Sequence, residues 1–400
     1  MTKSTKKSFS TLAVHAGERQ SHSDYTPVVT PIHSTVGFLY KSMKDVDDIF
    51  DSSREGYVYP RYGSPTIEAF EKAMVELEGG EISHAFSTGM AAIHAALLSV
   101  GVQEGKTVLS AMDVYGSTYT LLKDFFYQMG VSSHFVDITD LKQVERALSE
   151  FHPIVLLAET ISNPLLKVTN IPELSKLSHQ YKAKLLIDNT FASPFLYQPL
   201  LHGADFVIHS ATKYIGGHGD VMAGVVITSS MYDHKLSELK KLIGGILGPF
   251  DAWLAMRGLK TLPLRMQKQC QNAAHIAQWL SRHPKIKAVN YPGLNPHPQH
   301  NLAQEMFEGR GFGGMLSFEI AGVNKATSFR FMEALNLCLP ATTLGDIYTL
   351  VLHPASSSHR TLTPEEKKQI GISEGLIRLS SGIEDVSDII LDLEQAFSKI

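Results

Sequence analysis

The segment D-F-V-I-H-S-A-T-K-Y-I-G-G-H-G-D, Asp205 to Asp220, decides how the rest of the 400-residue chain is interpreted. It begins with the short apolar run Phe206 to Ile208, which is typical of a buried strand, and continues with hydroxyls, a lysine and a glycine cluster. Functional groups of α/β proteins lie at such strand ends. Because an amine held just after a buried strand loses charge to desolvation, Lys213 is the first candidate for a nucleophile.

The residues around Lys213 fit a ligand that carries both a phosphate and an aldehyde. Ser210 and Thr212 supply hydroxyl donors, and the glycines within residues 216–219 let the backbone approach a ligand closely. Pyridoxal phosphate (PLP) carries both groups. Most lysines are solvated surface residues, which is the ordinary interpretation of a single lysine, but these neighbours favour the cofactor.

A second predicted strand ends in a carboxylate. Lys184 to Asn189 reads K-L-L-I-D-N, in which Asp188 follows the apolar residues. PLP requires a carboxylate beside its pyridinium nitrogen. An aspartate at a strand end can also be a cap or a metal ligand, but its pairing with the Lys213 segment favours the cofactor role.

Three motifs together resemble the Cys/Met metabolism family of PLP-dependent enzymes. They are D-N-T-F-A-S-P at Asp188 to Pro194, H-S-A-T-K-Y-I-G-G-H-G-D at His209 to Asp220, and R-L-S-S-G-I-E-D at Arg378 to Asp385. The family includes cystathionine γ-synthase, cystathionine β- and γ-lyases, methionine γ-lyase and O-acylhomoserine sulfhydrylases. The resemblance implies the architecture of a fold-type I PLP-dependent transferase, with a smaller α+β domain at the C-terminus.

The apolar pattern also predicts an α/β fold. Apolar runs alternate with amphipathic ones from about residue 107 to residue 228, which indicates a mainly parallel sheet between helices, with the strand ends brought to one edge. We expect an N-terminal arm at residues 1–63 that contributes to a neighbouring subunit, a PLP-binding α/β domain at 64–257 and an α+β domain at 258–400. One long helix is expected at Ser117 to Met129.

A predicted helix start offers a second place for a phosphate. Ser87, Thr88 and Gly89 precede an apolar helix, and a helix start presents unpaired N–H groups and a positive dipole end. The cofactor phosphate is therefore expected against Gly89 and Met90. By itself the pattern favours an ordinary capped core helix, and the family resemblance is what favours the phosphate site.

The resemblance also implies that two subunits share the site. In the family, the tyrosine and arginine of a Y-x-R motif come from the neighbouring subunit and hold the cofactor phosphate; here they are Tyr59 and Arg61. An arginine fork suits phosphate oxygens. The aromatic segment alone, Gly56 to Gly63, is more often a packed loop. The family resemblance further implies a homotetramer, built as a dimer of dimers.

Four more residues receive roles from the resemblance. Tyr115 would stack on the cofactor ring and transfer protons, while Asn163, in E-T-I-S-N-P, would support substrate and cofactor; Ile161 replaces the usual proline there, so the loop shape stays open. Thr343 stands at the family's substrate-side serine. Arg378 lies in a strand-like run where a guanidinium needs an anion, either a structural partner or the substrate α-carboxylate, which the resemblance implies.

These groups predict a carbon–sulfur lyase of trans-sulfuration. Lys213 would hold PLP covalently and then move the Cα proton, and Asp188 would keep the ring nitrogen protonated. Tyr115 and Lys213 are the candidates for protonating the departing thiolate. Elimination from a cystathionine- or methionine-type substrate would yield a thiol, a 2-oxo acid and ammonia.

Residues that distinguish members of the family give a mixed signal. Thr342 stands where cystathionine γ-lyases and γ-synthases commonly carry a glutamate, and L-G-D at Leu344 to Asp346 resembles methionine γ-lyases. Those lyases, however, often have a cysteine in place of Ser117 and a Lys-Asp pair in place of Lys240-Lys241. The close alternative is a γ-replacement enzyme, either a cystathionine γ-synthase or an O-acylhomoserine sulfhydrylase. Alternatives of other classes are a non-catalytic PLP-fold scaffold and an aminotransferase.

Composition excludes several kinds of partner. The charge balance, 36 basic minus 40 acidic residues giving −4, argues against nucleic acid or an anionic membrane. No apolar run approaches the roughly 18 residues that span a bilayer, and the basic start, Met1 to Lys7, has no apolar region after it. Only a small sulfur amino acid is expected as substrate.

The few cysteines and the histidines suggest neither disulfides nor a metal. Cys270 and Cys338 lack a C-x-x-C spacing, which is typical of a reducing compartment, so we expect a cytoplasmic protein. His297 and His300 lie in a proline-rich loop without an acidic or cysteine partner, so this loop is interpreted as a turn and no metal is expected.

Overall fold

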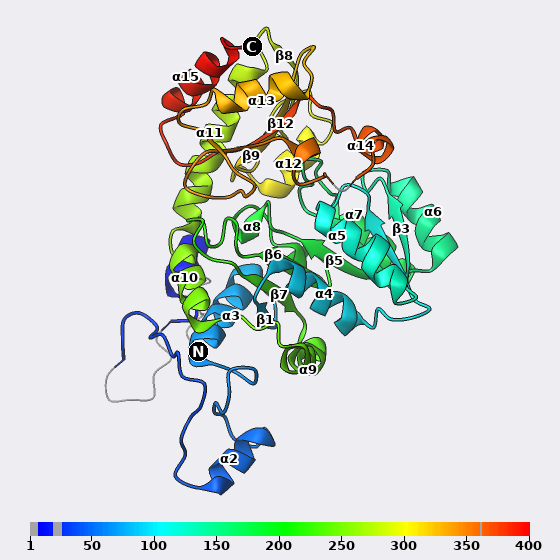
Figure 1. Cartoon of the computed structure of the whole chain (residues 1–400). Helices are drawn as coiled ribbons and strands as arrows, with labels where there is room; N and C mark the ends of the chain where they lie inside the picture. The colour runs from blue at the N-terminus through cyan, green and yellow to red at the C-terminus, as the bar shows by residue number, and fades with distance from the viewer. Residues whose placement is uncertain (1–6, 19–25, 361) are drawn as a thin grey trace.

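The computed structural model describes residues 7–18, 26–360 and 362–400, so most of the basic start, residues 1–6, lies outside the described residues. Figure 1 shows two sheets stacked along the molecule, with a long helix beside them and an N-terminal segment that extends away from the body. Among the described residues, no helix is long and apolar enough to cross a membrane.

The large sheet has seven strands in the order β1-β7-β6-β5-β4-β2-β3. Strands β2 to β6 pair in parallel, whereas β7 runs antiparallel to both β6 and β1. The mainly parallel sheet predicted from the sequence is therefore confirmed. The strands are β1 (Ile82–Phe86), β2 (Thr107–Ala111), β3 (Ser132–Val136), β4 (Val155–Glu159), β5 (Lys184–Asp188), β6 (Phe206–Ser210) and β7 (Gly224–Thr228).

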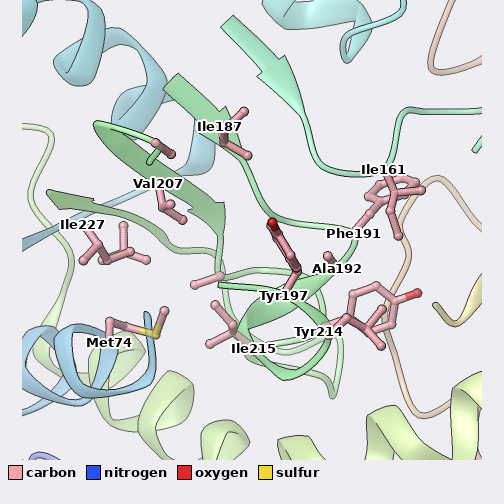
Figure 2. Close-up of a cluster of buried hydrophobic side chains, with 14 of the residues drawn as sticks. Met74, Ile161, Ile187, Phe191, Ala192, Tyr197, Val207, Tyr214, Ile215 and Ile227 are labelled. Carbon is pink, nitrogen blue, oxygen red and sulfur yellow. The ribbon is translucent and has the colours of Figure 1, made fainter. Parts of the chain in front are cut away.

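Both faces of this sheet are buried, which explains why its central strands are continuously apolar. Successive side chains of a strand point to opposite faces, so Val207 belongs to one core cluster while Phe206 and Ile208 belong to another. Figure 2 shows Val207 in the first cluster together with Tyr214 and Ile215, the two residues that follow Lys213. The turn that carries Lys213 is therefore anchored in the core by its next two side chains.

Helices of this half cover the sheet on both sides. Helix α3 packs against β1 and α10, and α4 packs against β6 and β7. The helices are α3 (Pro65–Glu78), α4 (Gly89–Val100), α5 (Gly116–Thr120), α6 (Leu141–Phe151), α7 (Ile171–Gln180), α8 (Ser193–Leu196), α9 (Asp233–Ile243) and α10 (Pro249–Leu259), with short turns η1 (Leu121–Phe126), η2 (Pro199–His202) and η3 (Ser230–Tyr232).

The second sheet is smaller and mostly antiparallel, with the order β10-β11-β12-β9-β8. Its own core contains Phe318, Phe331 and Phe397. The strands are β8 (Ile286–Asn290), β9 (Met315–Ile320), β10 (Leu339–Pro340), β11 (Leu350–Leu352) and β12 (Leu376–Ser380). Helices α11 (Leu262–Leu280), α12 (His300–Phe307), α13 (Lys325–Glu333), α14 (Pro364–Ile370) and α15 (Val386–Phe397), with turn η4 (Pro354–Ser356), complete this half.

The N-terminal segment contains α1 (Phe9–His15), which packs on α3 and α11, and α2 (Met43–Phe50). In Figure 1, α2 lies far from both sheets. Apolar side chains at the start of α2 and just before it are exposed: Met43 is 79% exposed, and Leu39 is fully exposed. Such a surface marks a contact region, because monomeric proteins seldom leave apolar side chains together in water.

Two elements differ from the sequence expectations. The helix expected at Ser117 to Met129 consists of α5 followed by a π-helical turn, η1. Strand β1 was not predicted, because polar residues interrupt its apolar pattern. The structure pairs those residues: the Ser83 hydroxyl donates to the Glu71 carbonyl at 2.7 Å, and His84 Nε2 lies 2.8 Å from Asp233 Oδ1.

Candidate active site

The candidate site lies where parallel strands of the large sheet end. Asp188 closes β5 and Ser210 closes β6, and the β4–β5 register places Glu159 directly opposite Asp188. The carboxyl ends of parallel strands share one edge, so residues distant in sequence converge there. The lysine turn follows β6 at this edge.

Lys213 is held between the two halves of the chain. Its Nζ donates to Thr343 Oγ1 at 2.9 Å, a contact that joins residues 130 positions apart. Burial, together with the nearby positive charge of Arg378, lowers the pKa of Lys213 to about 8. The neutral amine, which is the form that acts as nucleophile or base, is therefore far more populated near neutral pH than for an ordinary lysine.

Arg378, on β12, is a buried cation with neutral partners. Its guanidinium donates from Nη1 to Asn163 Oδ1 at 3.2 Å and from Nη2 to the Thr343 carbonyl at 3.0 Å. Only 3% of the residue is exposed, and burial lowers its pKa to about 10. Among the described residues no carboxylate forms an ion pair with it, so the alternative of a structural ion pair has no support. The arrangement suits an incoming carboxylate.

The loop of Asn163 has a defined shape despite the missing proline. Ile161 is buried and forms a bridge with Val168, and the N–H of Ser162 donates to the Lys167 carbonyl at 2.9 Å. These contacts turn Asn163 toward Arg378. The substitution at Ile161 therefore leaves the asparagine beside the arginine.

Asp188 offers a carboxylate that suits a cationic ring nitrogen. One oxygen, Oδ1, accepts from the N–H of Thr190 at 2.9 Å. Burial raises the pKa of Asp188, while Thr190 and the nearby His209 oppose this shift. A carboxylate desolvated in this way gains strongly from a positively charged donor placed against it.

Helix α4 begins where a phosphate is expected. The hydroxyl of its N-cap, Thr88, accepts from the N–H of Ala91 at 3.0 Å, and helix geometry leaves the first N–H groups, those of Gly89 and Met90, without intrahelical partners. A Cβ on Gly89 would lie 2.8 Å from Cβ of Ser210. Only glycine fits there, so the Ser210 side chain lies directly against the helix start.

Thr212 is engaged differently from its neighbour. Its hydroxyl donates to the Ala223 carbonyl at 3.2 Å and accepts from the Ala223 N–H at 3.0 Å. The Thr212 hydroxyl thus already donates its proton to a main-chain carbonyl, whereas no hydrogen bond of the Ser210 hydroxyl is present among the described residues. Of the two predicted hydroxyl donors, Ser210 is the more available.

Tyr115 lies at the rim of the site. It is 39% exposed, and its N–H donates to Glu159 Oε1 at 2.6 Å. Burial lowers the pKa of Arg378, and the tyrosines Tyr214 and Tyr115 oppose this shift. The ring is thus free to meet a ligand while its backbone is fixed.

Tyr59 and Arg61 lie in the arm and do not join the site within one chain. The Arg61 guanidinium lies 4.7 Å from the centre of the Tyr59 ring. Among the contacts of the described residues, none connects this pair with Lys213, Asp188 or Arg378. The arrangement leaves them available to a second copy of the chain.

Two further residues belong to the site although sequence reasoning gave them no role. Burial, with Asp188 and Asp113 nearby, raises the pKa of Glu159 well above its usual value. His359 is fully buried, and burial next to Arg378 lowers its pKa to about 4, so the imidazole is neutral. The available signals were weak: Glu159 opens the motif E-T-I-S-N-P, and His359 ends the run H-P-A-S-S-S-H.

The proline-rich loop forms turns, with His297 N–H bonded to the Leu294 carbonyl and His300 Nδ1 2.8 Å from the Pro292 carbonyl oxygen. In the described part of the chain, no group of three or more histidine, cysteine, aspartate or glutamate side chains is arranged to hold a metal.

Comparison with known proteins decides the family. The model of the Cys/Met metabolism PLP-dependent enzymes matches residues 10–398. The chain belongs to this family. It is 42% identical over 393 residues to an L-methionine γ-lyase of Fusobacterium nucleatum subsp. polymorphum, covering 98% of each chain. It is also 42% identical over 346 residues to a cystathionine γ-lyase of Bacillus subtilis, covering 86% of this chain and 89% of that one.

Among solved structures, the family member cystathionine γ-synthase of Xanthomonas oryzae pv. oryzae, in complex with aminoacrylate and cysteine, superimposes with a TM-score of 0.92. The two chains are 36% identical over 99% of this chain and 100% of that one. The family resemblance, the fold class and PLP as the cofactor are therefore confirmed. The donor set fits that cofactor: a buried amine, a desolvated carboxylate and a helix start beside a hydroxyl.

Proposed function

We propose that the protein is a PLP-dependent carbon–sulfur lyase of sulfur amino-acid metabolism. It removes a thiol from a methionine- or cystathionine-type amino acid and yields a 2-oxo acid and ammonia. The observation that carries the proposal is the contact of the buried Lys213 amine with Thr343, whose carbonyl in turn binds Arg378. The names of the 42%-identical relatives support the lyase class.

Arg378 and Asn163 recognise the substrate. The guanidinium already points at neutral acceptors, and exchanging them for the α-carboxylate replaces weak bonds with charge-assisted ones. Because Arg378 and Lys213 both contact Thr343, binding in this position brings the substrate Cα close to Lys213. The buried cation thus supplies both affinity and orientation.

Lys213 holds and moves the proton at Cα. With a pKa of about 8 its amine accepts a proton readily and returns it readily, which is the requirement for a base that later acts as an acid. The Thr343 hydroxyl fixes the direction of the amine. Tyr115, whose exposed ring lies at the rim, gives a proton to the departing sulfur.

The cofactor is held by residues of three elements. Asp188 would hold its ring nitrogen, the start of α4 with Ser210 would hold its phosphate, and Lys213 would bind its aldehyde carbon. Bound PLP supplies an electron sink for the negative charge that develops at Cα. Tyr59 and Arg61 complete the phosphate site of a neighbouring subunit, because their own chain does not bring them to Lys213.

γ-Replacement is the second candidate. A cystathionine γ-synthase superimposes on this chain with a TM-score of 0.92, and replacement uses the same proton transfers. Replacement differs in the leaving group, which is the carboxylate of an O-acylhomoserine, and in the final step, in which an incoming thiol forms a new bond to Cγ; elimination instead ends with hydrolysis to the 2-oxo acid and ammonia. The residues of the site serve both outcomes, so product analysis has to decide.

The test is to supply L-methionine, L-cystathionine, and an O-acylhomoserine with cysteine to the PLP-loaded protein. Our proposal predicts 2-oxobutanoate from γ-elimination or pyruvate from β-elimination of cystathionine, each with equimolar ammonia. A new thioether, with methionine and cystathionine left intact, would indicate the replacement enzyme. No product from any of the three would support a scaffold.

We further propose that the protein is a homotetramer in the cytoplasm. Each chain is divided into an arm (1–63), a PLP-binding domain (64–257) and a C-terminal domain (258–400). The exposed apolar side chains around α2 support assembly through the arm. All strands of the large sheet lie within residues 82–228 and those of the small sheet within 286–380, which supports the division. Both cysteines are free and buried, as suits a reducing compartment.

A further inference from the structure

Helix α11 places two polar side chains behind the lysine turn. Arg265 is 4% exposed and Gln269 is fully buried. They lie four residues apart and therefore face the same side of the helix. Neither belongs to a motif that suggested the function.

Arg265 binds the main chain that follows Lys213. Its Nη1 donates to the Tyr214 carbonyl at 2.7 Å, and its Nη2 donates to the Gly258 carbonyl at 2.8 Å and the Ile215 carbonyl at 3.3 Å. The guanidinium lies so close to Gly217 that a Cβ there would collide with it. One side chain thus fixes the lysine turn and joins it to the end of α10.

Gln269 binds the loop that carries Thr343. Its Nε2 donates to the Asp346 carbonyl at 2.7 Å. This loop also packs directly on the lysine turn, because a Cβ on Gly345 would lie 2.6 Å from the Tyr214 nitrogen. The amine–hydroxyl contact between Lys213 and Thr343 therefore spans two segments that α11 holds from behind.

We propose that Arg265 and Gln269 are positioning residues that set the separation between the Lys213 turn and the Thr342–Asp346 loop. Arg265 fixes the amine that holds the cofactor, and Gln269 fixes the loop whose Thr343 carbonyl binds the substrate arginine. A buried guanidinium that, within the described part of the chain, donates only to neutral groups, main-chain carbonyls and the Thr261 hydroxyl, with the Asp346 carboxylate nearby but not bonded to it, is an expensive way to stabilise a turn, so a geometric requirement accounts for it better. These separate roles of Arg265 and Gln269 rest on the proposed function.

The chain offers a matched control on the same helix. Asn272 is 1% exposed, and its Nδ2 donates to the carbonyls of Gly382 at 3.0 Å and Glu384 at 2.9 Å. Asn272→Leu removes a buried polar side chain of the same kind without touching either site segment. The change in thermal midpoint of this variant measures what an ordinary structural hydrogen bond contributes to stability.

The experiment compares Arg265→Lys, Gln269→Leu and Asn272→Leu in the PLP-loaded protein. Three quantities are measured: the thermal midpoint, the dissociation constant of PLP from its visible absorbance, and kcat and KM for 2-oxo acid release. We expect Arg265→Lys to weaken PLP binding about tenfold. We expect Gln269→Leu to raise KM about fivefold while PLP binding changes less than about twofold.

Asn272→Leu is expected to lower the thermal midpoint while PLP binding and KM stay within about twofold of the wild type. If the two test variants behave like this control, with lost stability but unchanged PLP binding and KM, the proposal is overturned. Should Arg265→Lys not fold, the proposal is still decided by comparing the KM of Gln269→Leu with that of Asn272→Leu. A wild-type protein that binds PLP but releases no 2-oxo acid would refute the proposed function alone, because the PLP comparison remains valid.

Discussion

The strand edge of the large sheet and the N-terminal arm differ in what a single chain can position. At the edge, Asp188 accepts from the nearby Thr190 N–H and Lys213 donates to the distant Thr343, while Arg378, on the small sheet, donates to Asn163. In the arm, Tyr59 and Arg61 contact each other, and the neighbouring apolar side chains face outward. The residues of the first region are therefore brought together within one chain, whereas the tyrosine and arginine of the second have no contact with them in the described part of the same chain.

Removing the amine of Lys213 should have the largest effect on activity at the strand edge. Lys213→Ala should lower kcat for 2-oxo acid release by at least about 10³-fold, because both the covalent attachment and the proton transfer are lost. The measurement is product formation at saturating substrate, with the thermal midpoint as the folding control. Activity within tenfold of the wild type would contradict the assigned role.

Substrate recognition at the edge should be the next most sensitive feature. Arg378→Lys keeps the charge but loses the fork, so kcat/KM should fall about 10²-fold, mainly through KM. A substrate analogue with a carboxamide in place of the α-carboxylate provides the control. The wild type should discriminate strongly between the two compounds and the variant only weakly; equal discrimination would refute carboxylate binding.

Subunit mixing sharpens the comparison with the arm. Arg61→Ala should weaken PLP binding about tenfold and lower activity at limiting PLP. If Arg61 serves the neighbouring subunit, co-assembling Arg61→Ala with Lys213→Ala chains restores about a quarter of the sites, since half of random dimers are mixed and each has one intact site. If Arg61 served its own chain, mixing would restore nothing.

Burial of the amine should also be visible in stability. The folded-state pKa of Lys213, about 8, lies below its ordinary value of 10.5, so folding of the apoprotein is penalised while the amine is protonated. Lys213→Met should therefore stabilise the apoprotein at pH 7, and this gain should fade as the pH rises from about 8 to about 10.5. Chemical unfolding at several pH values measures it, and a gain independent of pH would contradict a buried amine.

The smallest effect is expected at the hydroxyl beside the amine. Thr343→Ser keeps the acceptor for Lys213 Nζ and should change kcat less than about threefold, whereas Thr343→Val should lower it about tenfold. Steady-state kinetics measure both effects, and Thr343→Ser serves as the control for Thr343→Val. Equal rates in both would mean that the hydroxyl contact does not direct the amine.

Sequence patterns predict those parts of the site that lie next to a strand. Asp188 and Lys213 follow apolar runs directly, and parallel strands bring their ends to one edge, so local pattern and simple geometry suffice. The order of the strands and the reversal of β7 have no such local signal. Strand β1 was missed because Ser83 and His84 interrupt its apolar pattern, although both are buried and each has a side-chain contact, Ser83 with the Glu71 carbonyl and His84 with Asp233.

Long-range contacts explain the remaining gaps. The Lys213–Thr343 contact joins residues 130 positions apart, and Arg265 reaches back 50 positions to Ile215. Such contacts depend on how the two halves of the chain pack together. The spacing of residues within either half does not predict this packing. Glu159 illustrates the same limit, since its raised pKa comes from burial and from two carboxylates distant in sequence, Asp188 and Asp113.

The central claim is that the buried amine of Lys213 carries the cofactor. Borohydride reduction of the PLP-loaded protein, followed by proteolysis and mass mapping, tests it most directly. Our account predicts one reduced pyridoxyl phosphate per chain, on the peptide that contains Lys213 and on no other lysine. A label on a different lysine, or a protein that binds PLP without any covalent attachment, would contradict it.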